Sequence, residues 1–95
     1  MYKIVRSKRF AKSLRKLQRS GRFTQSVRYD LEEVFDFLTR GELLPHSYFD
    51  HQLKGEYVAY RECHIRGDLL LMYRRDEGAR VVVLSDIGTH PQLFG

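Results

Sequence analysis

Residues 57–86 read YVAYRECHIRGDLLLMYRRDEGARVVVLSD, and this stretch decides the fold. It contains three strand-like runs, Tyr57–Ile65, Leu69–Arg75 and Arg80–Asp86, which are separated by short polar connections that each contain a glycine. Such connections are typical of β-hairpins. The second half of the chain is therefore predicted to be an antiparallel meander, in which the apolar run 81–84 is a central strand buried on both sides.

Two amphipathic helices are predicted upstream of this meander. The first follows a possible N-cap at Ser7 and ends at Gly21, and the second is capped by Thr24 or Ser26 and ends at Gly41. Their apolar positions recur with the helical period: Phe10, Leu14 and Leu17 in the first, and Val27, Leu31, Val34, Phe35 and Leu38 in the second. The short connection between them predicts an antiparallel helical hairpin that packs on the core.

The remaining segments complete the predicted fold. Tyr2–Arg6 reads as a short strand, residues 43–54 as a loop, and residues 88–95 as a tail in which Leu93 and Phe94 hold the chain end down. A chain of 95 residues is large enough for one domain but too small for two. The order β-α-α-β-β-β predicts an α+β fold, with an antiparallel sheet and a two-helix hairpin on one face.

Positive charge is concentrated at the N-terminus. The chain has a net charge of +5 and a pI near 9.6. Nine basic residues and no acidic one lie between Met1 and Arg22, whereas the second helix carries Glu32, Glu33 and Asp36 on its outer face. The basic block fits a polyanion or an acidic protein partner, although a solvated helix face has a similar composition.

The sequence also indicates the compartment. Cys63 is the single cysteine, so no internal disulfide can form, which suits a reducing cytosol. The basic N-terminus lacks the apolar segment of a signal peptide, and no apolar run is long enough to span a bilayer. We therefore expect a cytoplasmic protein without a membrane partner.

The strand run 57–65 carries the groups that suggest chemistry. Because strand side chains alternate between faces, Glu62 and His64 should share one face and point outward, about 6–7 Å apart along the strand. Ala59, Cys63 and Ile65 should share the helix-covered face.

Further titratable groups lie near the ends of the meander. Asp68 begins the next strand across the turn from His64, His51 precedes the first strand, and His90 follows the last. If the loops fold over one sheet end, these groups converge with Glu62 into a site for metal-free acid–base chemistry. Taken alone, any one of these histidines is more often a surface or hydrogen-bonded structural residue.

Two competing chemistries are disfavoured. Cys63 and His64 are adjacent in a strand and should face opposite ways, so they cannot ligate one ion, and no CxxC or HxxxH pair is present. Cys63 is also a poor nucleophile, because its predicted face is buried. No metal and no cofactor are expected.

Two segments resemble a known family. The sequence DHQLKGEYVAYRECHIRGDLLLMYR, followed by the terminal GTHPQLFG, is similar to the YafQ-type branch of the RelE/ParE superfamily of bacterial toxins. The matching motifs are DH-x-L-x-G, YR-x-x-H, the aspartate before the apolar strand, and GTH-x-x-LF. The predicted element order matches the superfamily as well, so the whole chain is expected to be one RelE-like toxin domain.

The resemblance implies a function. It implies the toxin of a type II toxin–antitoxin pair, an endoribonuclease that cleaves mRNA in the ribosomal A site and is silenced by an acidic cognate antitoxin. Ribosomal RNA is then a further partner, through the basic first helix, unless that helix binds the antitoxin instead.

The resemblance also implies roles for particular residues. The positions of His51, His64, Asp68 and His90 are catalytic in such toxins, with the last histidine as general acid, and Glu62 occupies a position where aspartate is usual. Tyr57 takes the place of a tryptophan that helps to hold RNA. Lys54, Tyr57, Arg61 and Phe94 are therefore the expected RNA-binding residues.

The expected reaction is attack of the RNA 2′-hydroxyl on the adjacent phosphorus, which yields a 2′,3′-cyclic phosphate and a free 5′-hydroxyl. Asp68 or His64 is the expected base and His90 the expected acid. Arg61 either stabilises charge on the phosphate or, because of its predicted face, is a structural residue beneath the sheet.

Two other functions compete with the nuclease. A ParE-like toxin that inhibits DNA gyrase by binding would share the fold, but that branch lacks this set of histidines. A plain RNA-binding module would bind without cleaving, and the chain lacks the interleaved aromatic platform that such modules use.

Overall fold

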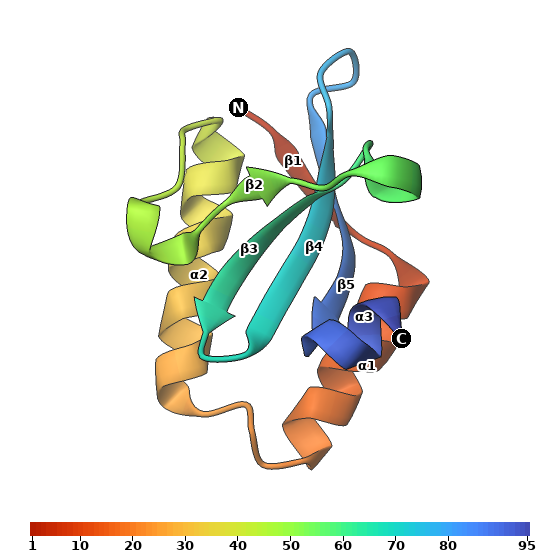
Figure 1. Ribbon diagram of the computed structural model, residues 1–95. Helices are drawn as coiled ribbons and strands as arrows, with labels where there is room; N and C mark the ends of the chain where they lie inside the picture. The colour runs from red at the N-terminus through yellow and green to blue at the C-terminus, as the bar shows by residue number, and fades with distance from the viewer.

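The computed structural model describes residues 1–95 and shows five strands and three α-helices (Figure 1). The elements in chain order are β1 (Lys3–Arg6), α1 (Lys8–Arg19), α2 (Gln25–Arg40), the 3-10 helix η1 (His46–Tyr48), β2 (His51–Gln52), the 3-10 helix η2 (Gly55–Tyr57), β3 (Arg61–Arg66), β4 (Leu69–Asp76), β5 (Val81–Gly88) and α3 (His90–Phe94). The α+β class and the pair of helices before the meander are confirmed.

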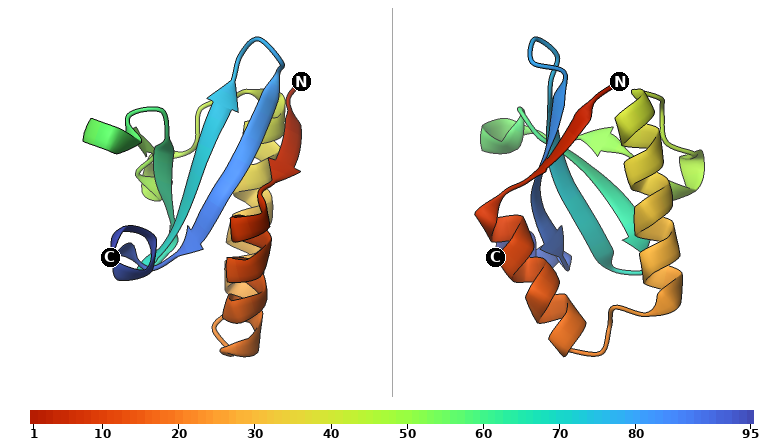
Figure 2. Two further views of the ribbon diagram at one scale, coloured as in Figure 1. Left: turned by 90° about the vertical axis from the view of Figure 1, so that its right-hand side faces the viewer. Right: turned by 180° about the vertical axis from the view of Figure 1, so that it is seen from behind.

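The strands form one sheet in the order β1-β5-β4-β3-β2. Strands β2 to β5 pair antiparallel, as predicted, but β1 runs parallel to β5, with Lys3 opposite Val81, so the sheet is mixed. Helices α1 and α2 cover one face, while the short α3 lies on the other (Figure 2). The sheet therefore has one face under the helical hairpin and a second face that is only partly covered.

Local signals fix the ends of both long helices. The Ser7 side chain accepts a hydrogen bond from the amide of Phe10 at 3.0 Å and caps α1. Thr24, rather than Ser26, caps α2 by accepting from the amide of Val27 at 3.2 Å. Gly41 ends α2 in the left-handed conformation, with φ of 71°. None of the helices combines the length and apolar content needed to cross a membrane.

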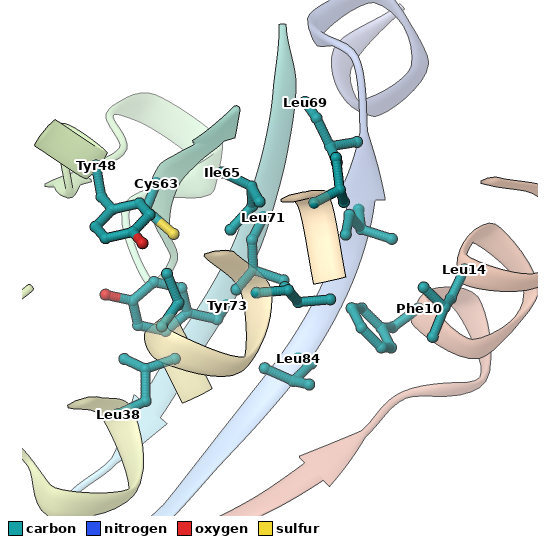
Figure 3. Close-up of a cluster of buried hydrophobic side chains, with 14 of the residues drawn as sticks. Phe10, Leu14, Leu38, Tyr48, Cys63, Ile65, Leu69, Leu71, Tyr73 and Leu84 are labelled. Carbon is teal, nitrogen blue, oxygen red and sulfur yellow. The ribbon is translucent and has the colours of Figure 1, made fainter. Parts of the chain in front are cut away.

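The main core lies between the helical hairpin and the sheet (Figure 3). Helix α1 packs on β5 and α2 on β3. The side chains buried most completely are Tyr73, Phe10, Leu38, Leu71, Leu84, Val34, Val82 and Cys63. A second, smaller cluster on the opposite face joins Leu70 and Met72 of β4 to Leu93 of α3. The prediction that the chain end is pinned by Leu93 is thus confirmed.

The run 57–65 is only partly a strand. Strand β3 begins at Arg61, because residues 55–57 form a 3-10 turn and the amide of Tyr60 donates to the carbonyl of Tyr57 at 2.9 Å. Ala59, predicted on the helix-covered face, is exposed. The apolar character of residues 57–60 instead reflects packing of Tyr57 and Tyr60 on the smaller cluster.

Strand β5 contains a β-bulge that the alternating pattern does not reveal. Tyr73 pairs with Leu84, but the next residue back, Met72, pairs with Asp86, so Ser85 is an extra residue. The bulge puts Asp86 on the α3 face, although Val82 and Leu84 face the helical hairpin. The strand runs to Gly88 rather than ending at Asp86, and one side of the run 81–84 is fully buried while the other is only partly buried.

Two further segments differ from expectation. The predicted loop 43–54 contains η1 and the two-residue strand β2. The predicted tail forms α3, which is stabilised by a capping box: Thr89 accepts from the amide of Gln92, whose side chain accepts from the amide of Thr89.

Candidate active site

Two imidazoles surround a buried carboxyl group on the α3 face of the sheet. His51 of β2 is the cross-strand partner of Glu62, and His64 lies two residues further along β3 on the same face. The Nε2 atoms of His51 and His64 lie 3.6 and 3.7 Å from Oε1 of Glu62. We call these three residues the His–Glu–His cluster.

Glu62 shares a face with His64, as the alternation predicted, but it does not reach solvent. Only 3% of the residue is exposed, because β2 places His51 beside it. Its Oε2 atom is buried without a hydrogen-bond partner. Buried polar atoms are normally paired. The unpaired oxygen therefore makes Glu62 a candidate functional residue.

The orientation of His51 is fixed by the backbone. Its Nδ1 lies 2.7 Å from the carbonyl oxygen of Phe49. A carbonyl can only accept, so Nδ1 carries a proton and Nε2 faces Glu62. Distances of 3.6 and 3.7 Å exceed those of a hydrogen bond. The cluster therefore presents a carboxyl oxygen and two Nε2 atoms at a spacing too long for a direct hydrogen bond, which a substrate hydroxyl can bridge.

The third histidine of the predicted site, His90, stands apart at the start of α3. Its side chain is exposed and makes no hydrogen bond within the protein, and its ring centroid lies 5.0 Å from that of Phe94. Phe94 in turn packs edge-on against Tyr57 at 5.2 Å. Leu93 anchors the helix by packing on β4.

The strand register relates His90 to the His–Glu–His cluster. His64 pairs with Leu70, and Leu70 pairs with Gly88, two residues before His90. Two strand spacings separate the Cα atoms of His64 and Gly88 by about 10 Å. Because directly paired residues share a face, the cluster and α3 flank β4 on the same side of the sheet.

Other predicted site residues lie elsewhere. Asp68 lies in the exposed β3–β4 turn, where its carboxylate forms an ion pair with Arg22 at 2.6 Å and contacts none of the histidines. Lys54 is exposed immediately before η2.

Arg61 is on the helix-covered face and bonds a second carboxylate. Its guanidinium donates to Oδ2 of Asp50 at 2.9 and 3.2 Å, and the Tyr73 hydroxyl donates to Oδ1 at 2.6 Å. Burial would lower the pKa of Arg61, but the bonds to Asp50 outweigh it, so the net pKa shift is upward. Burial and Asp50 both raise the pKa of Tyr73, which stays a neutral donor. This geometry fits the structural role for Arg61 better than the phosphate-binding one.

Cys63 is on the opposite face from His64, as the alternation predicted. It is fully buried, and burial raises the pKa of its thiol. A buried thiol with a raised pKa is unreactive. No group of three or more His, Cys, Asp or Glu side chains is arranged to hold a metal ion.

Three residues near the site were not predicted. Phe49 contacts His64, Asp50 anchors Arg61, and Asp86 is buried on the α3 face. Only Asp50 had a visible signal, because it directly precedes His51 in the DH motif. The position of Phe49 depends on a loop conformation and that of Asp86 on the bulge, and neither follows from alternation.

A basic groove of about 420 Å³ lies beside the site, between α1 and the end of β5. It is lined by Arg9, Lys12, Ser13, Lys16, Leu17, Ser20, Arg22, Asp86, Ile87, Gly88 and Gln92. Asp86, the one acidic residue in this set, is buried and binds Nε of Arg9 at 2.8 Å, which orients that guanidinium in the groove. The groove extends to Gly88 and to Gln92, which lies in α3 together with His90.

Comparison with known proteins agrees with this fold. A family model described as a bacterial toxin of type II toxin–antitoxin system, YafQ, matches residues 2–95. The chain is therefore a toxin of the type II toxin–antitoxin class. Within that class it belongs to the YafQ family.

Two curated relatives from Escherichia coli are named mRNA interferase toxin YafQ, that is, endoribonucleases. The K12 protein is 36% identical over 52 residues, which are 55% of this chain and about half (54%) of that protein. The protein of strain B / BL21-DE3 is 29% identical over 91 residues, which cover 85% of this chain and 97% of the relative.

Solved structures are similar over nearly the full length. A copper-bound mutant toxin from Helicobacter pylori has a TM-score of 0.87 and 37% identity, covering 99% of this chain and 100% of that one. The YafQ chain in an E. coli DinJ–YafQ complex has a TM-score of 0.82 and 27% identity, with 100% of both chains covered.

Proposed function

We propose that this chain is a ribosome-dependent endoribonuclease that cleaves mRNA in the A site and is silenced by an acidic antitoxin. The E. coli relatives are named mRNA interferases, and one solved neighbour is a complex of YafQ with DinJ, a toxin–antitoxin pair. Because its substrate is translated mRNA, the proposed site of action is the cytoplasm.

The observation that best supports this proposal is that the His–Glu–His cluster and the helix that begins at His90 lie on the same face of the sheet. Cleavage by 2′-hydroxyl attack needs a base on the attacking side and an acid on the leaving side. The His–Glu–His cluster and α3, which begins at His90, flank β4 on one face, and the register puts the Cα atoms of His64 and Gly88 about 10 Å apart. A phosphodiester bound between the cluster and α3 would have one group on each side.

In the proposed reaction, Nε2 of His64 removes the 2′-hydroxyl proton and the 2′-oxygen attacks the phosphorus. The bond from phosphorus to the 5′-oxygen breaks, and His90 gives that oxygen a proton. The products are a 2′,3′-cyclic phosphate and a 5′-hydroxyl. The proton stays on His64, whose positive charge the carboxylate of Glu62 stabilises from 3.7 Å.

Asp68 is the alternative base. Its ion pair with Arg22 holds it at the turn, so it would need to leave that partner to reach the RNA. Cleavage rates of Asp68→Asn and His64→Ala separate the two assignments, because the variant that removes the base should lose about 10²–10⁴-fold.

RNA would be held by stacking and by charge. Tyr57 and Phe94 form an aromatic pair beside His90 on which a base can stack. Lys54 adds an exposed charge, and the basic groove offers Lys12 and Lys16 to phosphates of mRNA or ribosomal RNA. The antitoxin is the competing occupant of this basic surface.

The test uses purified protein, ribosomes programmed with a defined mRNA, and the same mRNA free in solution. Cleavage of the ribosome-bound mRNA alone, with 2′,3′-cyclic phosphate and 5′-hydroxyl ends, is the expected result. Cleavage should persist in EDTA at concentrations that leave the ribosome intact, because every proposed step uses side chains. Intact mRNA on ribosomes, or loss of cleavage on chelation with recovery on metal addition, would contradict the proposed mechanism.

A further inference from the structure

Phe49 combines high exposure with a constrained backbone. The residue ends η1 in the left-handed conformation, with φ of 48° and ψ of 42°, and 67% of it is exposed to solvent. Its amide donates to the carbonyl of His46 at 3.0 Å, and its own carbonyl accepts from Nδ1 of His51. Bulky side chains rarely adopt this conformation, and where they do a function is often involved.

The ring of Phe49 lies against the His–Glu–His cluster. Its centroid is 5.7 Å from that of His64, with the planes inclined at 65°. Its surroundings are therefore the polar groups of a candidate active site, whereas apolar anchors in protein interfaces lie in well-packed, desolvated pockets. An exposed aromatic ring in a polar site suits a nucleobase, which has an apolar face and polar edges.

We propose that Phe49 is a stacking subsite for the base of the nucleotide whose 2′-hydroxyl attacks, that is, the nucleotide 5′ of the cut. This inference rests on the proposed function. If His64 removes the 2′-hydroxyl proton, the 5′ nucleotide lies at the His–Glu–His cluster, and Phe49 is the aromatic ring there. The Tyr57–Phe94 pair beside His90 then serves the nucleotide on the leaving side.

The subsite has a ligand preference that follows from its chemistry. A single ring offers area but no hydrogen bonds, so it should favour purines over pyrimidines by stacking area and should not distinguish adenine from guanine. The 5′ nucleotide would then be selected by the size of its base, with larger bases preferred.

The variants separate the ring from the backbone. Phe49→Asn removes the ring but keeps the carbonyl that orients His51, and asparagine tolerates the left-handed conformation better than phenylalanine does. Phe49→Trp restores a stacking surface. Leu43→Asn is the matched control, because Leu43 is 87% exposed in the loop before η1 and does not belong to the His–Glu–His cluster.

The first measurement is single-turnover cleavage on programmed ribosomes, with the bases on each side of the cut varied. Phe49→Asn should lower cleavage by about 5- to 150-fold, the equivalent of one base–aromatic stack. It should also remove the purine preference at the 5′ nucleotide only. Phe49→Trp should retain both, and Leu43→Asn should behave as wild type. The melting temperature of Phe49→Asn should not fall.

The second measurement detects stacking without cleavage. A ribosome-bound mRNA with 2-aminopurine at the 5′ nucleotide, and with a 2′-deoxy sugar that blocks attack, should lose fluorescence on adding wild type or Phe49→Trp. The Phe49→Asn variant should leave it bright.

The outcomes separate this inference from the proposed function. If wild type cleaves and His90→Ala does not, but Phe49→Asn keeps the wild-type rate and base preference, the subsite is wrong and the nuclease stands. If Phe49→Asn cleaves normally but binds an acidic antitoxin less tightly, the ring belongs to a protein interface. Absence of cleavage by wild type would overturn the proposed function itself, and the fluorescence measurement still reports whether Phe49 stacks.

Discussion

At the scale of single residues, the unpaired Oε2 of Glu62 is the feature that most needs a reason. Burying a carboxyl oxygen without a partner destabilises the folded state. Proteins accept such a cost mainly where function requires it. The carboxyl group lies between two partly exposed imidazoles, which a substrate hydroxyl can reach.

Replacing Glu62 with glutamine should therefore separate stability from activity. Glu62→Gln keeps the shape, removes the ionisable oxygen, and lets an amide N–H donate to an imidazole. We expect the free energy of unfolding to rise by about 1 kcal/mol and cleavage to fall by up to about 10²–10³-fold. Thermal melting and ribosomal cleavage assays measure the two effects.

The control for this change is Glu56→Gln, at an exposed position in η2. It should alter neither quantity. If Glu62→Gln lowered the melting temperature while keeping full activity, Glu62 would be a structural residue that the reaction does not use.

Replacing His90 should lower activity without lowering stability, the opposite of what is expected for a structural histidine. Its side chain is exposed and makes no hydrogen bond within the protein. His90→Ala should leave the melting temperature within about 1–2 °C of wild type and lower cleavage by about 10²–10⁴-fold, the usual contribution of a positioned acid. A variant that unfolds, or that cleaves at the normal rate, would remove His90 from the mechanism.

Sequence reasoning at this scale succeeded where strand alternation was sufficient. Placing Glu62 and His64 on one face and Cys63 on the other required only the period of two. The burial of Glu62 did not follow, because it depends on β2 pairing across from it. The role of Phe49 could not be predicted either, because backbone angles in a loop are not encoded by periodicity.

At the scale of elements, the strand that carries His51 is held by one partly buried network of an ion pair and a hydrogen bond. Strand β2 has only two residues, so pairing with β3 contributes little stability on its own. Asp50, the residue before it, binds both Arg61 and the Tyr73 hydroxyl. This network ties the loop to strands β3 and β4.

Removing the carboxylate should loosen β2 and destabilise the fold. Asp50→Ala leaves the half-buried Arg61 without its partner and the Tyr73 hydroxyl without an acceptor. We expect a loss of about 2 kcal/mol in the free energy of unfolding, because the guanidinium keeps partial access to water. Tyr73→Phe removes one bond and should cost about 1 kcal/mol.

Denaturant unfolding measures both changes, and Glu42→Ala is the control. Glu42 forms an ion pair with Arg40 on the surface, and loss of such a pair should change stability by less than about 1 kcal/mol. If Asp50→Ala were no less stable than Glu42→Ala, the network would not be what holds β2.

The elements themselves were largely predictable, and the exceptions share a cause. Caps, apolar stripes and glycine turns located α1, α2, β4 and most of β5. The bulge at Ser85 and the parallel pairing of β1 were not visible, because both depend on contacts between distant segments. The bulge matters for the site, since it turns Asp86 toward Arg9 and leads the chain into α3.

At the scale of the whole molecule, charge is divided between surfaces. Helix α1 has a basic outer face and α2 an acidic one, as the sequence predicted. The structure adds that basic residues of α1 line a groove that extends to Gln92 of α3, the helix that begins at His90. An RNA strand entering the site could therefore lay neighbouring phosphates along Lys12 and Lys16.

Binding to ribosomes should then depend steeply on salt. Each phosphate contact releases condensed counterions, so the logarithm of the association constant should fall by roughly 0.7–0.9 per contact for each tenfold rise in salt. Lys12→Gln with Lys16→Gln should reduce this slope by about 1–2 and weaken binding at low salt. Lys3→Gln with Arg28→Gln removes the same amount of charge outside the groove and should have a smaller effect on the slope.

Sedimentation with ribosomes across a salt series measures binding of the unaltered groove and of the two double variants. All three proteins carry His90→Ala, which keeps the mRNA intact. A wild-type slope near zero would assign the groove to the antitoxin, in which case the Lys12 and Lys16 changes should weaken antitoxin binding instead.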